Sequence, residues 1–275
     1  MNRKASKFIL CAAAAGAALP LYMTAPGHAS KEKKAPFMGR NCAHRGLHSR
    51  DKSVPENSLE AFEQAALAGY GVELDVQLSR DGQVVVFHDD SLLRVCGVDA
   101  KVWDLDYSKL STLKLCGSSQ TVPLFTDVLK VINGRGPIIC ELKTGPRNRE
   151  LCRKTRDILR EYKGAVCIES FDPTIVAWFR FHGREFLRGQ LTNSAKDFMK
   201  DGSSFPLAFA LSHLAGNFMA RPQFIAHKLC EETLPVKLNY LFGAMRVCWT
   251  SHEPRNEKGK DCVIFEFYRP RKFFK

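Results

Sequence analysis

Beyond residue 40 the chain alternates between short apolar runs rich in β-branched residues and longer stretches with helical spacing. Short runs bounded by turn residues predict strands, and longer amphipathic stretches predict helices. The predicted strands cover residues 72–78, 84–87, 137–142, 165–168, 224–227, 246–249 and 262–265. The predicted helices cover residues 58–68, 126–132, 149–162 and 173–181. We expect Asn57 or Ser58 to cap the first helix, and Asp172 before Pro173 to open another.

This alternation predicts an α/β fold with a mostly parallel sheet. About eight strand candidates favour a closed (β/α)8 barrel of the TIM type, with a doubly wound sheet as the second choice. The sequence contains no Gly-rich phosphate loop of the kind that a Rossmann or P-loop fold carries.

One connection departs from the barrel repeat. Asp81-Gly82 is a strong hairpin signal between the runs at residues 72–78 and 84–88. A helical crossover needs about a dozen residues or more, which this link lacks. We therefore expect a distorted, helix-less link between these strands. A turn centred on Asp81-Gly82 places Asp75 opposite His88, about 5 Å apart at their Cβ atoms.

The N-terminal segment is different in character. Residues 8–25 are mostly apolar and follow Arg3, Lys4 and Lys7. Their number is at the lower limit for a membrane-spanning helix, and small residues at 25–29 also fit a signal-peptide cleavage site. We expect residues 1–40 to be a membrane anchor or a secretory signal, with membrane association preferred to secretion. Residues 41–275 then form one folded domain. Basic residues flank the segment on both sides, so its orientation stays open.

Charge and cysteine content change this picture little. The formal net charge is +12, and much of it lies near the two ends of the 275-residue chain. Basic residues beside an apolar segment are typical of contact with anionic lipid, and a basic surface also attracts anionic substrates. No nucleic-acid-binding motif is present, so we expect no nucleic-acid partner. The ten cysteines lack zinc-site spacing, and Cys140, Cys167 and Cys248 are expected to be small buried hydrophobes.

Paired acidic residues are the first candidates for chemistry. Glu73 and Asp75 lie two residues apart on a predicted strand and therefore project from the same face. Side by side, two carboxylates repel, and a hard cation such as Mg²⁺ or Ca²⁺ removes that conflict. Glu141 and Lys143 repeat the spacing at the end of another predicted strand.

Two histidines accompany these carboxylates. Imidazole titrates near neutral pH, so His44 and His88 can transfer protons to and from a reacting group. Arg45 can bind phosphoryl oxygens with its planar fork of donors, and Lys143 can add a point charge. Both histidines stand close to predicted strand ends among charged partners, which favours a functional role over a structural one.

The order of the motifs resembles the glycerophosphodiester phosphodiesterase family. HRG at residues 44–46, PENS at 55–58, ELDV at 73–76, FHD at 87–89, ELK at 141–143 and WT at 249–250 follow the family's order within residues 41–270. The resemblance implies a TIM barrel that uses two histidines and one divalent cation, Mg²⁺ or Ca²⁺. The implied roles are acid/base for His44 and His88, metal ligation for Glu73, Asp75 and Glu141, phosphate contacts for Arg45 and Lys143, hydrogen-bond support for Glu56, helix capping for Asn57, and pocket lining or core packing for Trp249.

The chain departs from the family pattern at four places. Ser58 replaces the usual Thr, and Glu169 stands where a small residue is common before Ser-Phe. Ser251-His252 follows the WT pair, and the last predicted strand runs into Glu266 where the family often has Thr-Asp. We expect none of these to touch the metal or the histidines, and we expect them to alter the leaving-group pocket.

Several functions follow from these patterns. The first is metal-dependent hydrolysis of a glycerophosphodiester to glycerol 3-phosphate and an alcohol, with water or the glycerol 2-hydroxyl as the attacking group. The second is lysophospholipase D-like cleavage of membrane lipids, with the apolar run at residues 205–218 as a lid at the bilayer; packing of this run on the barrel is preferred. A non-enzymatic binding module ranks below both, because all the candidate catalytic groups are present. The alcohol, the cation and the oligomeric state stay open.

Overall fold

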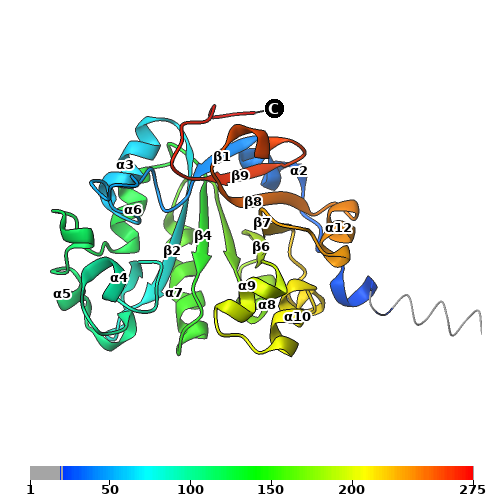
Figure 1. Ribbon diagram of the computed structural model, residues 1–275, viewed down its shortest axis with the longest axis horizontal. Coiled ribbons are helices and arrows are strands. Elements are labelled where there is room, and N and C mark those ends of the chain that lie inside the picture. Colours follow the sequence, from blue (N-terminus) through cyan, green and yellow to red (C-terminus); the bar gives the residue numbers. More distant parts are fainter. Residues whose placement is uncertain (1–18, 20, 275) are drawn as a thin grey trace, which may run out of the picture.

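In the computed structural model, which describes residues 19 and 21–274, eight parallel strands close into a barrel (Figure 1). These strands are β1 (Arg40–Ala43), β2 (Gly71–Leu78), β4 (Ile138–Leu142), β5 (Val166–Ser170), β6 (Leu187–Thr192), β7 (Phe224–Lys228), β8 (Met245–Ser251) and β9 (Cys262–Phe265). Each is hydrogen-bonded to its neighbour in the order β1-β9-β8-β7-β6-β5-β4-β2, and the pairing of β1 with β2 closes the ring. The predicted TIM barrel is confirmed.

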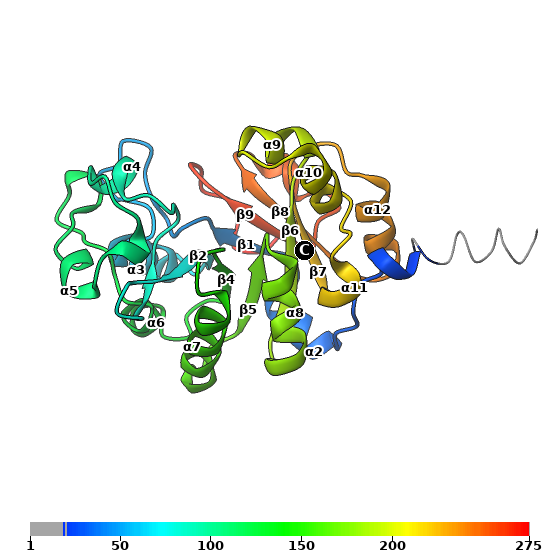
Figure 2. The same cartoon turned by 90° about the horizontal axis from the view of Figure 1, so that it is seen from below.

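Helices follow most of the strands and cover the outside of the barrel (Figure 2). The covering helices are α3 (Leu59–Leu67), α6 (Phe125–Ile132), α7 (Asn148–Glu161), α8 (Pro173–His182) and α12 (Leu234–Leu241). The connection from β6 to β7 instead holds α9 (Ala195–Lys200), α10 (Phe205–Ser212) and α11 (Asn217–Ala220). The four predicted helices are therefore confirmed. Asp172 caps α8 by accepting from Thr174 N–H, with Pro173 at the first helical position as predicted.

The link after β2 is the predicted helix-less hairpin, but its register is not the predicted one. β3 (Val84–Val86) pairs antiparallel with β2, and Val76 lies opposite Val86. Asp75 therefore faces Phe87, whose N–H donates to the Asp75 carbonyl, rather than His88. The turn has three residues instead of two, with Gly82 in the left-handed region at φ +79°, and the extra residue shifts the register by one.

An insertion of short elements follows β3 and has its own apolar cluster. It contains α4 (Leu93–Cys96), η2 (Val102–Asp104), α5 (Tyr107–Leu110) and η3 (Leu115–Gly117). In Figure 2, α4 and α5 lie at the opposite side of the molecule from α10 and α12. Phe87, Leu92, Leu110 and Leu115 are buried in this cluster, so the insertion packs as a unit beside the barrel.

Two strands of the barrel were not predicted. β1 is only four residues long and begins with Arg40 and Asn41. In β6, Arg188, Gln190 and Thr192 alternate with inward-facing residues and are buried beneath the outer layer. Their side chains donate hydrogen bonds to backbone carbonyl groups, Arg188 to Ala220 for example. With Leu187 and Leu191 as its large apolar residues, the strand lacks the β-branched run that marks the others in the sequence.

The barrel interior is apolar toward the amino ends of the strands. Cys42, Ile139, Cys167, Phe224 and Met245 meet there. α2 (Lys31–Lys34) and η1 (Ala35–Phe37) precede β1, and Phe37 packs into the same cluster. The charged and polar side chains of the barrel interior therefore gather at the carboxyl ends of the strands. Cys140, Cys167 and Cys248 are buried, as predicted.

The predicted N-terminal anchor or signal, residues 8–25, falls largely outside the described residues. Among the helices that the structure describes, none combines the length and the apolar character that crossing a membrane requires.

Gly189 of β6 marks the tightest point of the barrel wall. A Cβ atom there would overlap the ring of Phe224, which is fully buried. We expect Gly189→Ala to lower the free energy of unfolding by about 1–3 kcal/mol, because the core has no room for the methyl group. Urea unfolding would measure this. Gly145→Ala is the control, since its Cβ would meet Trp103 at an ordinary 3.7 Å. Equal stability of the two variants would contradict the expectation.

Candidate active site

A cavity of about 430 Å³ opens at the carboxyl ends of the barrel strands. This is the end of a TIM barrel where loops gather side chains from several strands. It is lined by His44, Arg45, Glu73, His88, Glu141, Lys143, Glu169, Phe171, Leu191, Asn193, Asp201, Lys228, Trp249 and Ile264. Most of the residues singled out in the sequence are therefore brought together here.

Three buried carboxylates form the acidic part of this site. Glu73 and Asp75 project from β2, and Glu141 projects from β4 directly beside Asp75. One oxygen from each can be chosen so that all three lie within 4.8 Å of one another. Burial, followed by the charges of the neighbouring carboxylates, raises the pKa of Glu73 well above its usual value. Burial also raises the pKa of Glu141. Negative charge on these carboxyls is therefore costly unless positive charge is close by, and a bound cation would supply it.

The loop between β1 and α3 holds two of these carboxylates. Arg45 N–H donates to Glu73 Oε2 at 3.0 Å, and Asn57 Nδ2 donates to Asp75 Oδ2 at 2.9 Å. Both donors are in the left-handed region, with φ of 53° and 55°. Such strain in residues other than glycine is typical of functional sites. Of the two expected caps Ser58 is confirmed, because it is the N-cap of α3 and accepts from Ala61 N–H. The capping role that the resemblance implied for Asn57 is wrong, and its side chain reaches Asp75 instead.

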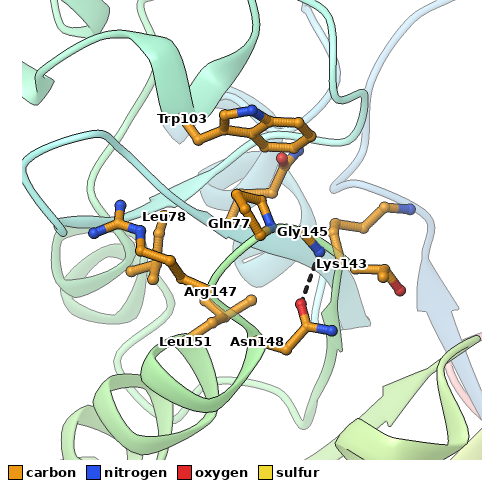
Figure 3. A pocket seen from close by; sticks show the side chains of 10 residues that line it. Gln77, Leu78, Trp103, Lys143, Gly145, Arg147, Asn148 and Leu151 are labelled. Carbon is orange, nitrogen blue, oxygen red and sulfur yellow. Dashed lines mark hydrogen bonds between the residues drawn. The ribbon is translucent and has the colours of Figure 1, made fainter.

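Lys143 lies on the other side of the carboxylates. Its Nζ is 2.8 Å from Glu141 Oε1 and 3.5 Å from Asp75 Oδ1. The loop that follows Lys143 is supported from the insertion. Figure 3 shows Trp103 lying across this loop, and Gly145 N–H donating to Asn148 Oδ1 at 2.7 Å. The insertion and the barrel together therefore position the ammonium group.

Both histidines are held by a carboxylate at the same ring nitrogen. His44 Nδ1 lies 3.0 Å from Glu266 Oε2, and His88 Nδ1 lies 2.6 Å from Asp89 Oδ1. A carboxylate at Nδ1 fixes the tautomer and leaves Nε2 for the cavity. His44 Nε2 is 3.8 Å from Glu73 Oε2, so this imidazole reaches the acidic cluster. Burial and the charge of Arg45 lower the pKa of His44 to about 4, although Glu266 opposes this shift.

Glu266 was not predicted as a site residue, and the expectation that its position leaves the histidines untouched is wrong. It lies 3.0 Å from His44, 3.6 Å from His48 and 2.8 Å from His252. Burial alone would raise the pKa of Glu266, but the hydrogen bond from His44 and the other histidines lower it below the usual range. The sequence did show a carboxylate directly after the last predicted strand, which could have marked Glu266 as a site residue. Its histidine partners come from other parts of the chain, so the sequence did not show which groups it contacts.

Glu56 and Arg94 link the two sides of the site. Arg45 Nη1 donates to Glu56 at 2.8 Å, and Arg94 of α4 donates to Glu56 at 2.7 and 2.8 Å. Arg94 also bonds both oxygens of Asp89, the partner of His88. Burial would raise the pKa of Glu56, but Arg94 and Arg45 lower it to about 2. Glu56 is thus a charged bridge from the β1–α3 loop to the insertion.

Trp249 lies on the opposite wall. It meets Phe171 edge to face at 5.8 Å and carries Lys228 Nζ 5.7 Å from its ring centroid. It lines the cavity, which favours pocket lining over ordinary core. Glu169, Asn193 and Lys228 also line the cavity and were not predicted as site residues. Each stands at or just after the end of a strand, and for Asn193 that strand was itself missed.

The donor set suits a divalent cation with oxygen ligands. The three carboxylates offer hard oxygen donors within 4.8 Å, and their repulsion is the conflict that a cation relieves. Neutral imidazole and two fixed positive charges surround them, so the site combines charge neutralisation with proton transfer.

Comparison with known proteins agrees with this chemistry. A model of the Glycerophosphoryl diester phosphodiesterase family matches residues 44–267. The chain is 30% identical to a lysophospholipase D of Rattus norvegicus over 156 residues, 52% of this chain and 48% of that protein. It is 34% identical to a glycerophosphodiester phosphodiesterase of Bacillus altitudinis over 108 residues, 37% of this chain and 43% of that protein. The matches thus span about half the length of these curated relatives.

Solved structures resemble the whole barrel. An Oleispira antarctica phosphodiesterase in complex with the product sn-glycerol-3-phosphate matches with a TM-score of 0.67 and 22% identity, covering 85% of this chain and 94% of that one. A glycerophosphodiester phosphodiesterase of Thermotoga maritima matches with a TM-score of 0.60 and 28% identity, covering 82% and 93%. The resemblance seen in the order of the motifs is confirmed. Because the family model matches residues 44–267 of 275, this chain belongs to the glycerophosphoryl diester phosphodiesterase family.

Proposed function

We propose that this protein is a metal-dependent phosphodiesterase that hydrolyses glycerophosphodiesters to glycerol 3-phosphate and an alcohol. One observation carries the proposal: three carboxylates lie within 4.8 Å of one another, and two of them line one cavity at the end of the barrel together with two carboxylate-held histidines. The family supports the same reaction class.

Glu73, Asp75 and Glu141 would hold one divalent cation, either Mg²⁺ or Ca²⁺, since both take carboxylate oxygens. When bound, the cation supplies positive charge that polarises a phosphoryl oxygen. Arg45 and Lys143 line the cavity beside these ligands and bind the remaining phosphoryl oxygens. Their charges oppose the negative charge that builds up on those oxygens in the transition state.

The two histidines divide the proton transfers. With its pKa lowered to about 4, His44 is neutral at pH 7 and its Nε2 can accept a proton from the attacking oxygen. His88, with Nδ1–H held by Asp89, acts in its doubly protonated form: it donates the Nε2 proton to the departing alkoxide and is left neutral. The attacking oxygen is either water or the glycerol 2-hydroxyl, and phosphorus NMR of the early product separates these routes.

Metal removal tests the proposal most directly. We expect EDTA to abolish hydrolysis of glycerophosphocholine and added Mg²⁺ or Ca²⁺ to restore it. Glu73→Gln and His44→Ala should each lower kcat/KM by about 10²–10⁴-fold, because one removes a ligand and the other a proton-transfer group. Release of glycerol 3-phosphate is the measurement.

Glu161→Gln is the matched control. Glu161 is exposed and is the last residue of α7, the helix that leads into the start of β5. It should retain wild-type activity. Undiminished hydrolysis in EDTA, or by either active-site variant, would rule out this mechanism.

Glu266 is a positioning residue whose removal has a distinct signature. We expect Glu266→Gln to lower kcat by about 10²–10⁴-fold, because His44 loses the carboxylate that orients it. Since Glu266 raises the pKa of His44, its loss should also move the acidic limb of the pH–rate profile to lower pH. Calcium or magnesium affinity, measured by calorimetry, should not change. A loss of activity with an unmoved acidic limb would assign Glu266 a merely structural role.

A second candidate is cleavage of lysophospholipids at a membrane surface. One observation favours it: on α10, Phe205, Leu207 and Phe209 are exposed, at 62%, 50% and 49% of their surface. The helix packs through the small residues Ala208 and Ser212 instead. The expected packing of this run on the barrel therefore holds for Ala208, Ser212 and Leu214 and fails for the exposed Phe205, Leu207 and Phe209. α10 follows soon after Asp201, which lines the cavity.

We also propose that the protein is membrane-associated through residues 1–40, with secretion after signal cleavage as the alternative. The apolar run at residues 8–25 and the basic residues around it support this proposal. The exposed face of α10 would add a second apolar contact with the same surface.

Vesicle binding and substrate choice test the lipid candidate together. We expect the full chain to co-sediment with vesicles of phosphatidylcholine and phosphatidylserine. The double variant Phe205→Ser, Phe209→Ser should lose activity on micellar lysophosphatidylcholine by at least about 10-fold, because it removes two exposed aromatic side chains that would become buried in the lipid. Activity on soluble glycerophosphocholine should stay unchanged.

Phe181→Ser is the control, because Phe181 is similarly exposed but lies near the end of α8. Equal loss on both substrates, or equal loss in the control, would count against the lipid contact. Absence of co-sedimentation would count against anchoring.

A further inference from the structure

Glu169 is a buried carboxyl that the mechanism above does not use. It stands on β5, directly beside Glu141 in the register, so Asp75, Glu141 and Glu169 form a row across three adjacent strands. Only 1% of its surface is exposed, yet it lines the cavity. Its Oε2 is buried and has no hydrogen-bond partner among the described residues. A buried polar atom of this kind costs free energy unless a bound ligand supplies a hydrogen-bond partner.

The wall around Glu169 differs from the wall around the proposed cation. Phe171, Leu191, Trp249 and Ile264 give this part of the cavity its apolar surface, and Asn193, Asp201 and Lys228 add polar groups to the same half of the cavity. Trp249 Nε1 is also buried and has no partner within the described chain. The region therefore offers an indole N–H donor and a carboxyl group against apolar walls. Hydroxyl groups on a short carbon chain match that pattern, because they donate to a carboxyl, accept from an indole, and leave the carbon atoms against apolar side chains.

The position of Glu169 indicates which part of the substrate it meets. Neighbouring strands are about 4.8 Å apart, so Glu169 lies one strand spacing beyond Glu141. That is roughly the reach from a phosphoryl group to the far hydroxyl of an attached glycerol. The next residue in the row is Gly189, and the Phe224 ring occupies the space that a side chain there would take. The row of residues thus ends at a closed wall with no room for a large group. Such a wall suits the glycerol, which is the same in every substrate, and does not suit the alcohol, which differs in size between substrates.

Resting on the proposed function, we propose that Glu169 is a specificity-determining residue that binds the terminal hydroxyl of the substrate's glycerol. A glycerol acylated at that hydroxyl cannot donate to Glu169 and would push its chain against the closed wall. The preferred substrate class is therefore the unacylated glycerophosphodiester rather than the lysolipid. A second cation at this place is disfavoured, because Lys143 Nζ already sits 2.8 Å from Glu141 Oε1.

The test compares two diesters that differ only at this hydroxyl. Glycerophosphocholine has it, and the phosphocholine diester of propane-1,2-diol lacks it but keeps the hydroxyl next to the phosphoester. We expect wild-type protein to prefer glycerophosphocholine by about 10- to 100-fold in kcat/KM, the range for a hydrogen bond to a buried carboxyl. Glu169→Leu should remove the preference by lowering kcat/KM only for glycerophosphocholine. Glu169→Gln, which keeps the shape and one acceptor, should retain part of it.

The outcomes separate the two proposals. If wild-type protein with Mg²⁺ or Ca²⁺ hydrolyses neither diester, the proposed function fails and this inference falls with it. If it hydrolyses both equally well, the function stands and the role of Glu169 is wrong, whether or not the variants fold. The role is also wrong if Glu169→Leu lowers both rates alike. Weaker binding of Ca²⁺ to Glu169→Leu in calorimetry would instead make Glu169 a metal ligand and overturn the inference.

Discussion

The repulsion among three buried carboxylates is the constraint around which the upper end of this barrel is arranged. Glu73, Asp75 and Glu141 are nearly inaccessible to water and close enough to share one ion. Buried like charges are tolerated only when other groups compensate them. Arg45 and Lys143 supply the compensating charge, and the lowered pKa of Asp75 reflects that compensation: burial would raise it, but His88, Lys143 and Arg45 outweigh burial.

The histidines depend on a second set of carboxylates that lies outside the cation cluster. Glu266 and Asp89 hold His44 and His88 by the same ring atom, so both imidazoles present Nε2 to the cavity. Arg94 then ties Asp89 to Glu56 and so to the β1–α3 loop. Because the insertion contributes Arg94, it orders a part of the site that the barrel strands alone do not reach. The groups for metal ligation and for proton transfer are thereby joined in one network through Arg94, Glu56 and Arg45.

The cavity is also asymmetric around its rim. Strands β1, β2 and β4 and the loops after them present the candidate metal ligands, the histidines, Arg45 and Lys143, and the side from β5 to β9 presents a mixed wall that holds the apolar side chains of the cavity. Phosphate chemistry therefore belongs on the first side. We assign the carbon-bearing part of the substrate to the second side, where Glu169 is a buried polar group. In this arrangement, one side of the cavity carries the groups for phosphodiester cleavage, and the other side determines which substrates bind.

The sequence by itself determined the fold class, the hairpin after β2, four of the five covering helices and the candidate ligands, because these depend on local periodicity and on residues a few positions apart. Only the tertiary structure decided the rest. The β2–β3 register depends on one extra residue in a turn, and the role of Asn57 depends on a left-handed backbone. The histidine partners of Glu266 and the Glu56 partner of Arg94 come from distant loops, 222 residues away along the chain for Glu266 and His44 and 38 residues away for Arg94 and Glu56. Such contacts arise from barrel closure, which joins distant strand ends and leaves no periodic trace in the sequence.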